Sequence, residues 1–131
     1  MPEKYLNKIL NAPVYDVAIE SPLDKAPGLS QRLGNRVLIK REDLQPVFSF
    51  KLRGAYNKLI NIPESARNKG VIAASAGNHA QGVALAASRI RVTATIVMPQ
   101  TTPGIKVSAV RKWGAKVILH GDDFAAAYAC A

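Results

Sequence analysis

The chain has 131 residues, of which 48% are apolar, 21% charged and 6% aromatic. This composition is typical of a globular domain and excludes a disordered tail or a fibre. No segment reaches the roughly 20 apolar residues that cross a bilayer. The single cysteine, Cys130, excludes an internal disulfide and a multi-cysteine metal site. We therefore expect a cytoplasmic protein with neither a membrane partner nor a bound metal ion.

The net charge of +9 is concentrated in one part of the chain. Residues 44–121 contain eleven Lys and Arg residues and one acidic residue, Glu64, whereas residues 1–43 are close to neutral. Such a basic block predicts an anionic partner, which is a nucleic acid, an acidic cofactor, or another subunit or domain. A small nucleic-acid-binding module is the weaker alternative, because the sequence contains no zinc, RRM or helix-turn-helix signature. We therefore expect no nucleic-acid partner.

The N-terminal third of the chain carries few signals of regular structure. We expect a short helix over residues 3–11 and a short β-run at residues 37–39. Between them, residues 14–36 are rich in Pro and Gly, so we expect irregular structure with a helical turn at 29–33.

After Pro46 the pattern is regular, with helical segments that alternate with short apolar runs. The expected helices cover residues 50–60, 79–88 and 103–113, the last with Gly114 at its C′ position, and Asp122 caps a further helix. The expected strands cover residues 71–74, 93–98 and 116–119.

This alternation predicts an α/β fold with an open, mostly parallel sheet. Continuous apolar strands are expected where helices cover both faces of the sheet. The C-terminal segment FAAAYACA favours a helix but ends without a capping residue. We therefore expect residue 131 to be a truncation point.

The loop after the predicted strand 71–74 is a candidate anion site. It reads Ser75-Ala76-Gly77-Asn78-His79 and leads into a helix. Small residues let a ligand approach the backbone, and the N–H groups and dipole of the helix start favour a carboxylate or a phosphate. The spacing fits equally well a simple strand-to-helix turn capped by Ser75 or Asn78.

Lys51 is a candidate nucleophile, because it begins a predicted helix and follows the aromatic Phe50. A lysine near a helix N-terminus, or one partly desolvated by an aromatic ring, loses its proton more easily. The neutral amine attacks aldehydes, which allows Schiff-base chemistry. The alternative is a solvated surface lysine. The mixed-charge run at residues 40–43 is interpreted as an ion-paired turn rather than a catalytic site.

Three segments together resemble the threonine dehydratase (threonine ammonia-lyase) family. They read KREDLQPVFSFKLRGAYNKL, VIAASAGNHAQGVALAAS and TIVMPQTTPGIKVSAVRKWGAKVILHG, in this order. The family has a tryptophan-synthase-β-like fold, PLP fold type II, and uses pyridoxal 5′-phosphate. The N-terminal stretch YLNKILNAPVYDVAIESPL is most similar to the biosynthetic branch that begins isoleucine synthesis. Catabolic threonine or serine dehydratases and serine racemases share the core motifs and remain alternatives.

The resemblance implies roles for the residues of the two central motifs. Lys51 would bond covalently to the cofactor aldehyde, Phe50 would pack beside the cofactor ring, and Asn78 would hydrogen-bond the 3′ oxygen of that ring. The substrate, threonine or serine, would bind through its carboxylate to a loop made of Ser75, Ala76, Gly77, Asn78 and His79. Threonine would be converted to 2-oxobutanoate and ammonia.

The resemblance also implies a domain organisation. Residues 1–45 would form an arm of the larger catalytic subdomain, residues 46–131 would form a truncated smaller subdomain, and the regulatory domain would be absent. The family's Gly-rich loop for the cofactor phosphate lies beyond residue 131. We therefore expect the 131 residues alone to be inactive and the full-length protein to be a homo-oligomer. A non-catalytic remnant and one chain of a split enzyme are further alternatives.

One position departs from the family pattern, which has Leu-Gly where this chain has Ile90-Arg91. The residue after a helix C-terminus commonly needs a positive φ, which glycine adopts freely. A residue with a Cβ there costs on the order of 1 kcal/mol. We expect this departure to lower stability without touching the site.

Overall fold

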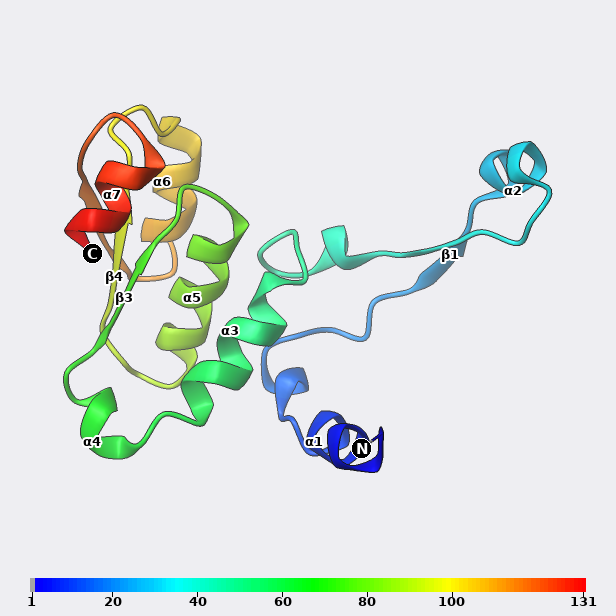
Figure 1. Cartoon of the computed structure of the whole chain (residues 1–131), viewed down its shortest axis with the longest axis horizontal. Coiled ribbons are helices and arrows are strands. Elements are labelled where there is room, and N and C mark those ends of the chain that lie inside the picture. The colour runs from blue at the N-terminus through cyan, green and yellow to red at the C-terminus, as the bar shows by residue number, and fades with distance from the viewer. Residues whose placement is uncertain (1) are drawn as a thin grey trace.

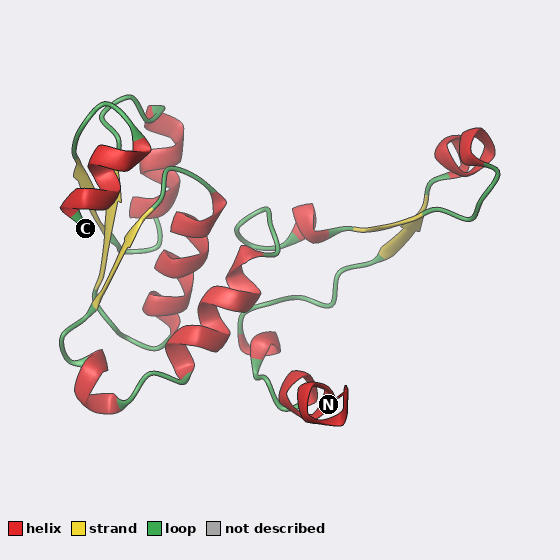
Figure 2. Ribbon diagram, in the orientation of Figure 1, coloured by secondary structure: helices red, strands yellow, loops and turns green. Residues whose placement is uncertain are grey.

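A three-stranded parallel sheet forms the centre of the structure, a computed structural model that describes residues 2–131. Its strands are β3 (Val71–Ala74), β4 (Ala94–Met98) and β5 (Lys116–Leu119), in the order β3-β4-β5. Ile96 on the central strand lies opposite Ala73 on one side and Val117 on the other. β4 is almost entirely buried because both of its edges are paired and helices cover both of its faces (Figure 2).

Helices pack on both faces of the sheet, as Figure 1 shows. α5 (Asn78–Arg89) and α6 (Gly104–Arg111) follow β3 and β4 and cover one face, whereas α7 (Phe124–Cys130) covers the other. Successive right-handed crossovers in one direction place α5 and α6 on the same face. The main core lies between α5 and the sheet, and its largest members are Ile96, Met98 and Tyr56. The expected open parallel sheet with helices on both faces is confirmed.

α3 (Lys51–Ile60) packs mainly along α5. Its inward face consists of Leu52, Ala55, Tyr56 and Leu59, all buried. The Tyr56 hydroxyl donates to Asp16 Oδ2 at 2.7 Å, and burial together with this bond raises the pKa of Tyr56. This contact ties the short 3₁₀ helix η1 (Val14–Asp16) to α3, and a short helix α4 (Glu64–Arg67) then leads to β3.

The segment between η1 and α3 leaves the body of the protein as a long arm (Figure 1). Its elements are the antiparallel strands β1 (Leu23–Lys25) and β2 (Leu38–Lys40), the helix α2 (Pro27–Leu33) between them, and the 3₁₀ helix η2 (Glu42–Leu44) at its base. An isolated two-stranded ribbon is marginally stable in water. Leu23, Leu33 and Ile39 nevertheless stay exposed on the arm, each at 45% or more. The N-terminal helix α1 (Pro2–Leu10) lies near α3.

Most of the predicted elements after Pro46 are confirmed within one or two residues. The helical turn expected at residues 29–33 is confirmed within α2, which begins earlier, at Pro27, whereas the expectation that the rest of 14–36 is irregular is wrong, because η1 forms there and β1 pairs with β2. Proline suits the first turn of a helix, and the helix ends at Gly34 with φ +58°. The cap of the last helix is Asp123 rather than Asp122, since its Oδ1 accepts the Ala126 N–H at 2.8 Å.

Two further differences concern a helix that was not predicted, α4, and the end of α6. α4 has no counterpart among the predicted elements, because four residues are too few for a periodic pattern. α6 ends at Arg111, and the turn that follows leads to Gly114 at φ +81°. No helix in the described part of the chain is long and apolar enough to span a membrane.

The end of α5 confirms the strain expected at Arg91. The Val92 N–H donates to the Ala87 carbonyl at 2.9 Å and the Arg91 N–H to the Ser88 carbonyl at 3.2 Å, which is the Schellman pattern. Arg91 therefore occupies the left-handed position, with φ +57°.

We predict that Arg91→Gly stabilises the chain by on the order of 1 kcal/mol, because glycine adopts this φ without a clash of Cβ. Urea unfolding followed by circular dichroism measures the effect. Arg91→Ala keeps the Cβ and removes the charge, so it is the control and should gain little. Equal stabilisation by both variants would assign the effect to charge and contradict the prediction.

Candidate functional site

Lys51 is the first residue of α3, and its side chain is exposed beside an aromatic ring. Lys51 Nζ lies 5.1 Å from the centre of the Phe50 ring, and the Lys51 backbone N–H donates to Ser49 Oγ at 3.4 Å. Within residues 2–131, Nζ makes neither a hydrogen bond nor an ion pair with the protein. The amine is thus available for a bond to a ligand, as its predicted role requires.

The Ser75–His79 loop joins the carboxyl end of β3 to the N-terminus of α5. The Ser75 N–H donates to the Val97 carbonyl at 3.0 Å and so continues the pairing of β3 with β4. Its Oγ accepts from the N–H groups of Gly77 (3.3 Å) and Ala80 (3.2 Å). The expected capping by Ser75 is therefore present. The remaining N–H groups of the first turn point out of the end of a twelve-residue helix, where the dipole favours an anion.

A surface pocket of about 480 Å³ brings the two motifs together. Phe50 and Lys51 at the start of α3 and His79 at the start of α5 line one end of it. The rest of its mostly apolar wall comes from α3, from β3 and from Val83 of α5, with Lys58 on α3. Ser75, Ala76, Gly77 and Asn78 precede His79 in the chain but do not line this pocket. The structure therefore joins Phe50, Lys51 and His79 directly and places the other four predicted residues beside them.

Gly82 on α5 allows the start of α3 to approach so closely. A Cβ built on Gly82 would lie 3.0 Å from both the carbonyl carbon and the oxygen of Lys51, and 3.1 Å from the Leu52 nitrogen. These are backbone atoms next to the fully buried Leu52, so they have little room to move. The sequence analysis missed this residue. Its signal was a glycine inside an Ala-rich helix, which indicates a close approach of another backbone.

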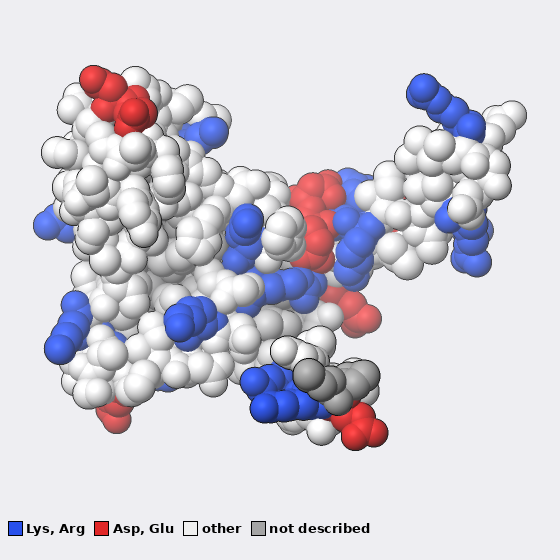
Figure 3. All heavy atoms as spheres, viewed as in Figure 1, with Lys and Arg blue, Asp and Glu red and all other residues white. Residues whose placement is uncertain are grey.

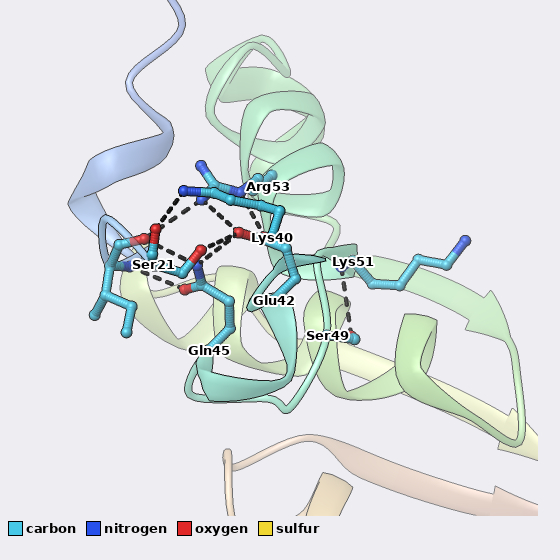
Figure 4. Close-up of polar contacts among 8 residues, drawn as sticks. Ser21, Lys40, Glu42, Gln45, Ser49, Lys51 and Arg53 are labelled. Carbon is cyan, nitrogen blue, oxygen red and sulfur yellow. Dashed lines mark hydrogen bonds and ion pairs between the residues drawn. The ribbon is translucent and has the colours of Figure 1, made fainter. Parts of the chain in front are cut away.

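A polar network at the base of the arm is the second feature that the sequence analysis missed (Figure 4). Glu42 and Arg53 form an ion pair, with Arg53 Nε 2.8 Å from Glu42 Oε2 and Nη2 3.0 Å from Oε1. Ser21 Oγ donates to Glu42 Oε1 at 2.7 Å, and Gln45 Nε2 donates to the same atom at 3.2 Å. The ion-paired turn predicted for residues 40–43 is confirmed, but no local pattern indicated that Glu42 reaches the helix of Lys51.

The network differs in burial from the other ion pairs of the arm. Figure 3 shows acidic and basic side chains together where the arm leaves the body. The Glu42 side chain is only 17% exposed, and the Arg53 side chain is 23% exposed. Arg41 instead pairs with Asp24 and Asp43 on the surface, where such pairs contribute little. Hydrogen bonding to Arg53 outweighs the burial of Glu42 and lowers the pKa of its carboxyl from 4.5 to about 2.

Comparison with known proteins identifies the family. Residues 14–131 match the family described as "Pyridoxal-phosphate dependent enzyme". The chain belongs to this family. The fold agrees, because the chain superposes with a TM-score of 0.92 on the processed form of threonine deaminase isoform 2 from Solanum lycopersicum. The two are 60% identical, and the match covers 98% of this chain and 37% of that one.

Two other proteins of the family bear on the function. The chain is 62% identical over 121 residues to "Threonine dehydratase biosynthetic, chloroplastic" of Arabidopsis thaliana, a match that covers 92% of this chain and 20% of the relative. It is 30% identical to maize serine racemase, with a TM-score of 0.82 over 87% of this chain and 35% of that one. The chain thus spans about a fifth of the length of the Arabidopsis relative.

The residues present fit the cofactor of the family. Pyridoxal phosphate carries an aldehyde, an aromatic ring and a phosphate. Lys51 offers a primary amine without a protein partner, and Phe50 offers an aromatic face at the same pocket. Lys58 and His79 line the same pocket and add basic groups that suit an anion. The residues that fit pyridoxal phosphate therefore gather around α3 and the start of α5.

We predict that Gly82→Ala is less stable than Gly54→Ala by about 1–3 kcal/mol, because it overpacks the contact between α5 and α3. Both changes put alanine inside a helix, so the gain in helix propensity cancels in the comparison. A Cβ on Gly54 meets nothing within 4 Å, which makes it the matched control. Urea denaturation measures both variants. Equal stabilities would show that the α3–α5 contact can open at no cost.

We predict that Glu42 makes folding stability depend on acid pH. Its pKa is lower in the folded chain (about 2) than the ordinary value of 4.5, so its contribution is present above pH 4.5 and is lost as the pH falls towards 2. The loss is on the order of 3 kcal/mol. Urea unfolding of the unsubstituted chain and of Glu42→Gln between pH 7 and pH 2 tests this. The variant should have the shallower decline, and parallel curves would refute the ion pair.

Proposed function

We propose that the protein that carries this chain is a threonine dehydratase of the biosynthetic type. It would convert L-threonine to 2-oxobutanoate and ammonia at the entry to isoleucine synthesis. The observation that carries the proposal is Lys51 at the start of α3, beside Phe50 and His79 in one pocket and without a hydrogen bond or ion pair of Nζ within residues 2–131. The identities of 62% and 60% to proteins named threonine dehydratase and threonine deaminase support the choice of substrate.

The roles proposed for the site residues are those that the family resemblance implies. Lys51 Nζ holds the cofactor through its aldehyde and, once released, takes the α-proton of the substrate. Phe50 packs beside the cofactor ring, and Asn78 hydrogen-bonds the ring oxygen. The N–H groups at the start of α5 bind the substrate carboxylate, together with Ser75, Ala76, Gly77 and His79. When bound, pyridoxal phosphate supplies the electron sink for charge that develops at the substrate α-carbon.

A serine racemase or a catabolic threonine or serine dehydratase is the second candidate. The fold alone does not separate these activities, since maize serine racemase has the same arrangement. The identity does favour one of them, because the chain is twice as similar to the tomato threonine deaminase as to that racemase. Threonine is therefore the first substrate to test, with serine as the comparison.

We further propose that residues 1–45 belong to the larger catalytic subdomain and residues 46–131 to the smaller one. The exposed Leu23, Leu33 and Ile39 support this division, because an arm that carries apolar side chains needs a partner surface. A homo-oligomer of the full-length protein and a cytoplasmic location complete the proposal. The single exposed Cys130 suits a reducing compartment, although the name of the Arabidopsis relative places that protein in the chloroplast.

We predict that Lys51→Ala abolishes threonine-dependent formation of 2-oxobutanoate by the protein that the complete reading frame encodes. The alanine side chain can neither hold the aldehyde nor take the α-proton. Lys51→Arg keeps the positive charge and should be equally inactive, whereas Lys112→Ala, on the exposed surface, should retain activity. Activity of Lys51→Ala within about tenfold of the unsubstituted protein would overturn the role of Lys51.

A further inference from the structure

The carboxylate of Glu42 is the centre of a network that holds both ends of one chain segment. It accepts hydrogen bonds from Gln45, which precedes the segment 46–52, and from Arg53, which follows it. Gln45 is in turn fixed to the arm, because its side chain bonds the N–H and the carbonyl of Ile19, each at 2.9 Å. Only 1% of Gln45 is exposed, so its amide depends on these partners.

The segment that the network encloses has a shape that needs support. Phe48 adopts φ +55°, a left-handed conformation that is unfavourable for a residue with a bulky side chain. The Phe48 ring is 74% exposed, so its own packing does not compensate for this conformation. Val47, which is fully buried, is the apolar anchor of the segment. The Phe48 N–H donates to the Gln45 carbonyl at 2.8 Å, so the segment also depends on the position of Gln45, which Glu42 contacts.

Lys51 lies at the end of this segment and takes no part in the network. Figure 4 shows its side chain pointing away from the side on which Arg53 meets Glu42. Lys51 and Arg53 are two residues apart in the first turn of α3, so a movement of the Arg53 backbone also moves Lys51. Gly82 lets α5 pack so closely against that turn that an added Cβ would lie 3.0 Å from the Lys51 carbonyl. The start of α3 is thus held between the network and α5.

We propose that Glu42 is a positioning residue for Lys51: by holding Gln45 and Arg53 it fixes the direction in which the Lys51 amine enters the cofactor pocket. The proposal rests on the proposed function, because it assumes that Lys51 is the residue that bonds the cofactor. Glu42 itself touches neither the pocket nor Lys51. Two lysines of α3 line the pocket, Lys51 and Lys58. If Glu42 only stabilised the fold, its loss would affect both lysines equally.

The first test compares the labelling of these two lysines in the 131-residue chain. Pyridoxal phosphate is added, sodium borohydride fixes the label, and peptide mass spectrometry gives the ratio of Lys51 to Lys58. We expect Lys51 to be labelled preferentially, and Glu42→Gln to bring the ratio down towards parity. Loss of folding would change both lysines and is checked by circular dichroism. An unchanged ratio, or parity in the unsubstituted chain, overturns the proposal.

Asp24→Asn is the matched control for the substitution at Glu42. Like Glu42→Gln, it removes a carboxylate of the arm that pairs with an arginine. The partner of Asp24, however, is Arg41, and this pair lies on the surface. We expect it to leave the labelling ratio unchanged. Should Asp24→Asn lower the ratio as much as Glu42→Gln, the effect would belong to the charge of the arm and the proposal would fail.

The second test uses threonine turnover by the protein that the complete reading frame encodes. A displaced catalytic group lowers kcat on the order of 100-fold, whereas loss of substrate binding raises KM. We expect Glu42→Gln to lower kcat and to leave KM within about twofold. A change in KM alone would overturn the proposal. Absence of turnover in the unsubstituted protein would instead refute the proposed function, and the labelling ratio would still decide the role of Glu42.

Discussion

The first turn of α3 rests on the middle of α5 with no side chain between the two backbones, and the site depends on this contact. Gly82 makes it possible, because any Cβ there would meet the Lys51 carbonyl at 3.0 Å. The contact brings Lys51 and Phe50 to the same pocket as His79, although the two motifs are far apart in the chain. The same contact sets how far the Lys51 amine lies from the start of α5. The absence of a Cβ at Gly82 thus lets the two parts of the candidate site come together.

Two kinds of interaction hold α3 in this contact: apolar burial and the Glu42–Arg53 ion pair. The apolar face of α3, with Leu52, Ala55 and Tyr56, presses the helix onto α5 and contributes through burial. The Glu42–Arg53 pair acts in a different way, because its hydrogen bonds fix the orientation of the two side chains, whereas apolar burial has no preferred direction. The bidentate geometry of this pair restricts the orientation of the Arg53 side chain in addition to its effect on stability. This separation explains why a small polar network can matter for the placement of one lysine.

The hydrophobic core of this chain does not extend into the arm beyond its base. Most of the buried residues belong to the three-layer body, whereas the arm keeps apolar side chains such as Leu23 and Ile39 exposed. The base of the arm is fastened to the body by the Glu42–Arg53 ion pair and by an apolar cluster in which Ala18 and Val47 join Leu52 and Leu85. The same few residues therefore join the arm to the site.

Local patterns in the sequence were enough to predict the helices and strands after Pro46 and the place of Lys51 at a helix start. Helix periodicity, apolar runs and the glycines and prolines that end them are properties of neighbouring residues. The same holds for the strain at Arg91, which depends on a single helix end. The cofactor was predicted from the resemblance of the two motifs to a known family, because hydrophobic periodicity carries no information about a cofactor.

Only the tertiary structure decided the pairing of β1 with β2, the approach at Gly82 and the ion pair of Glu42 with Arg53. Each joins residues that are separated by eleven or more positions, and a side chain's partner at that distance depends on how whole elements pack. A mixed-charge turn therefore looked like a surface feature until the fold placed it beneath the helix of Lys51. The sequence by itself determined which residues can do the chemistry, and packing determined which of them meet.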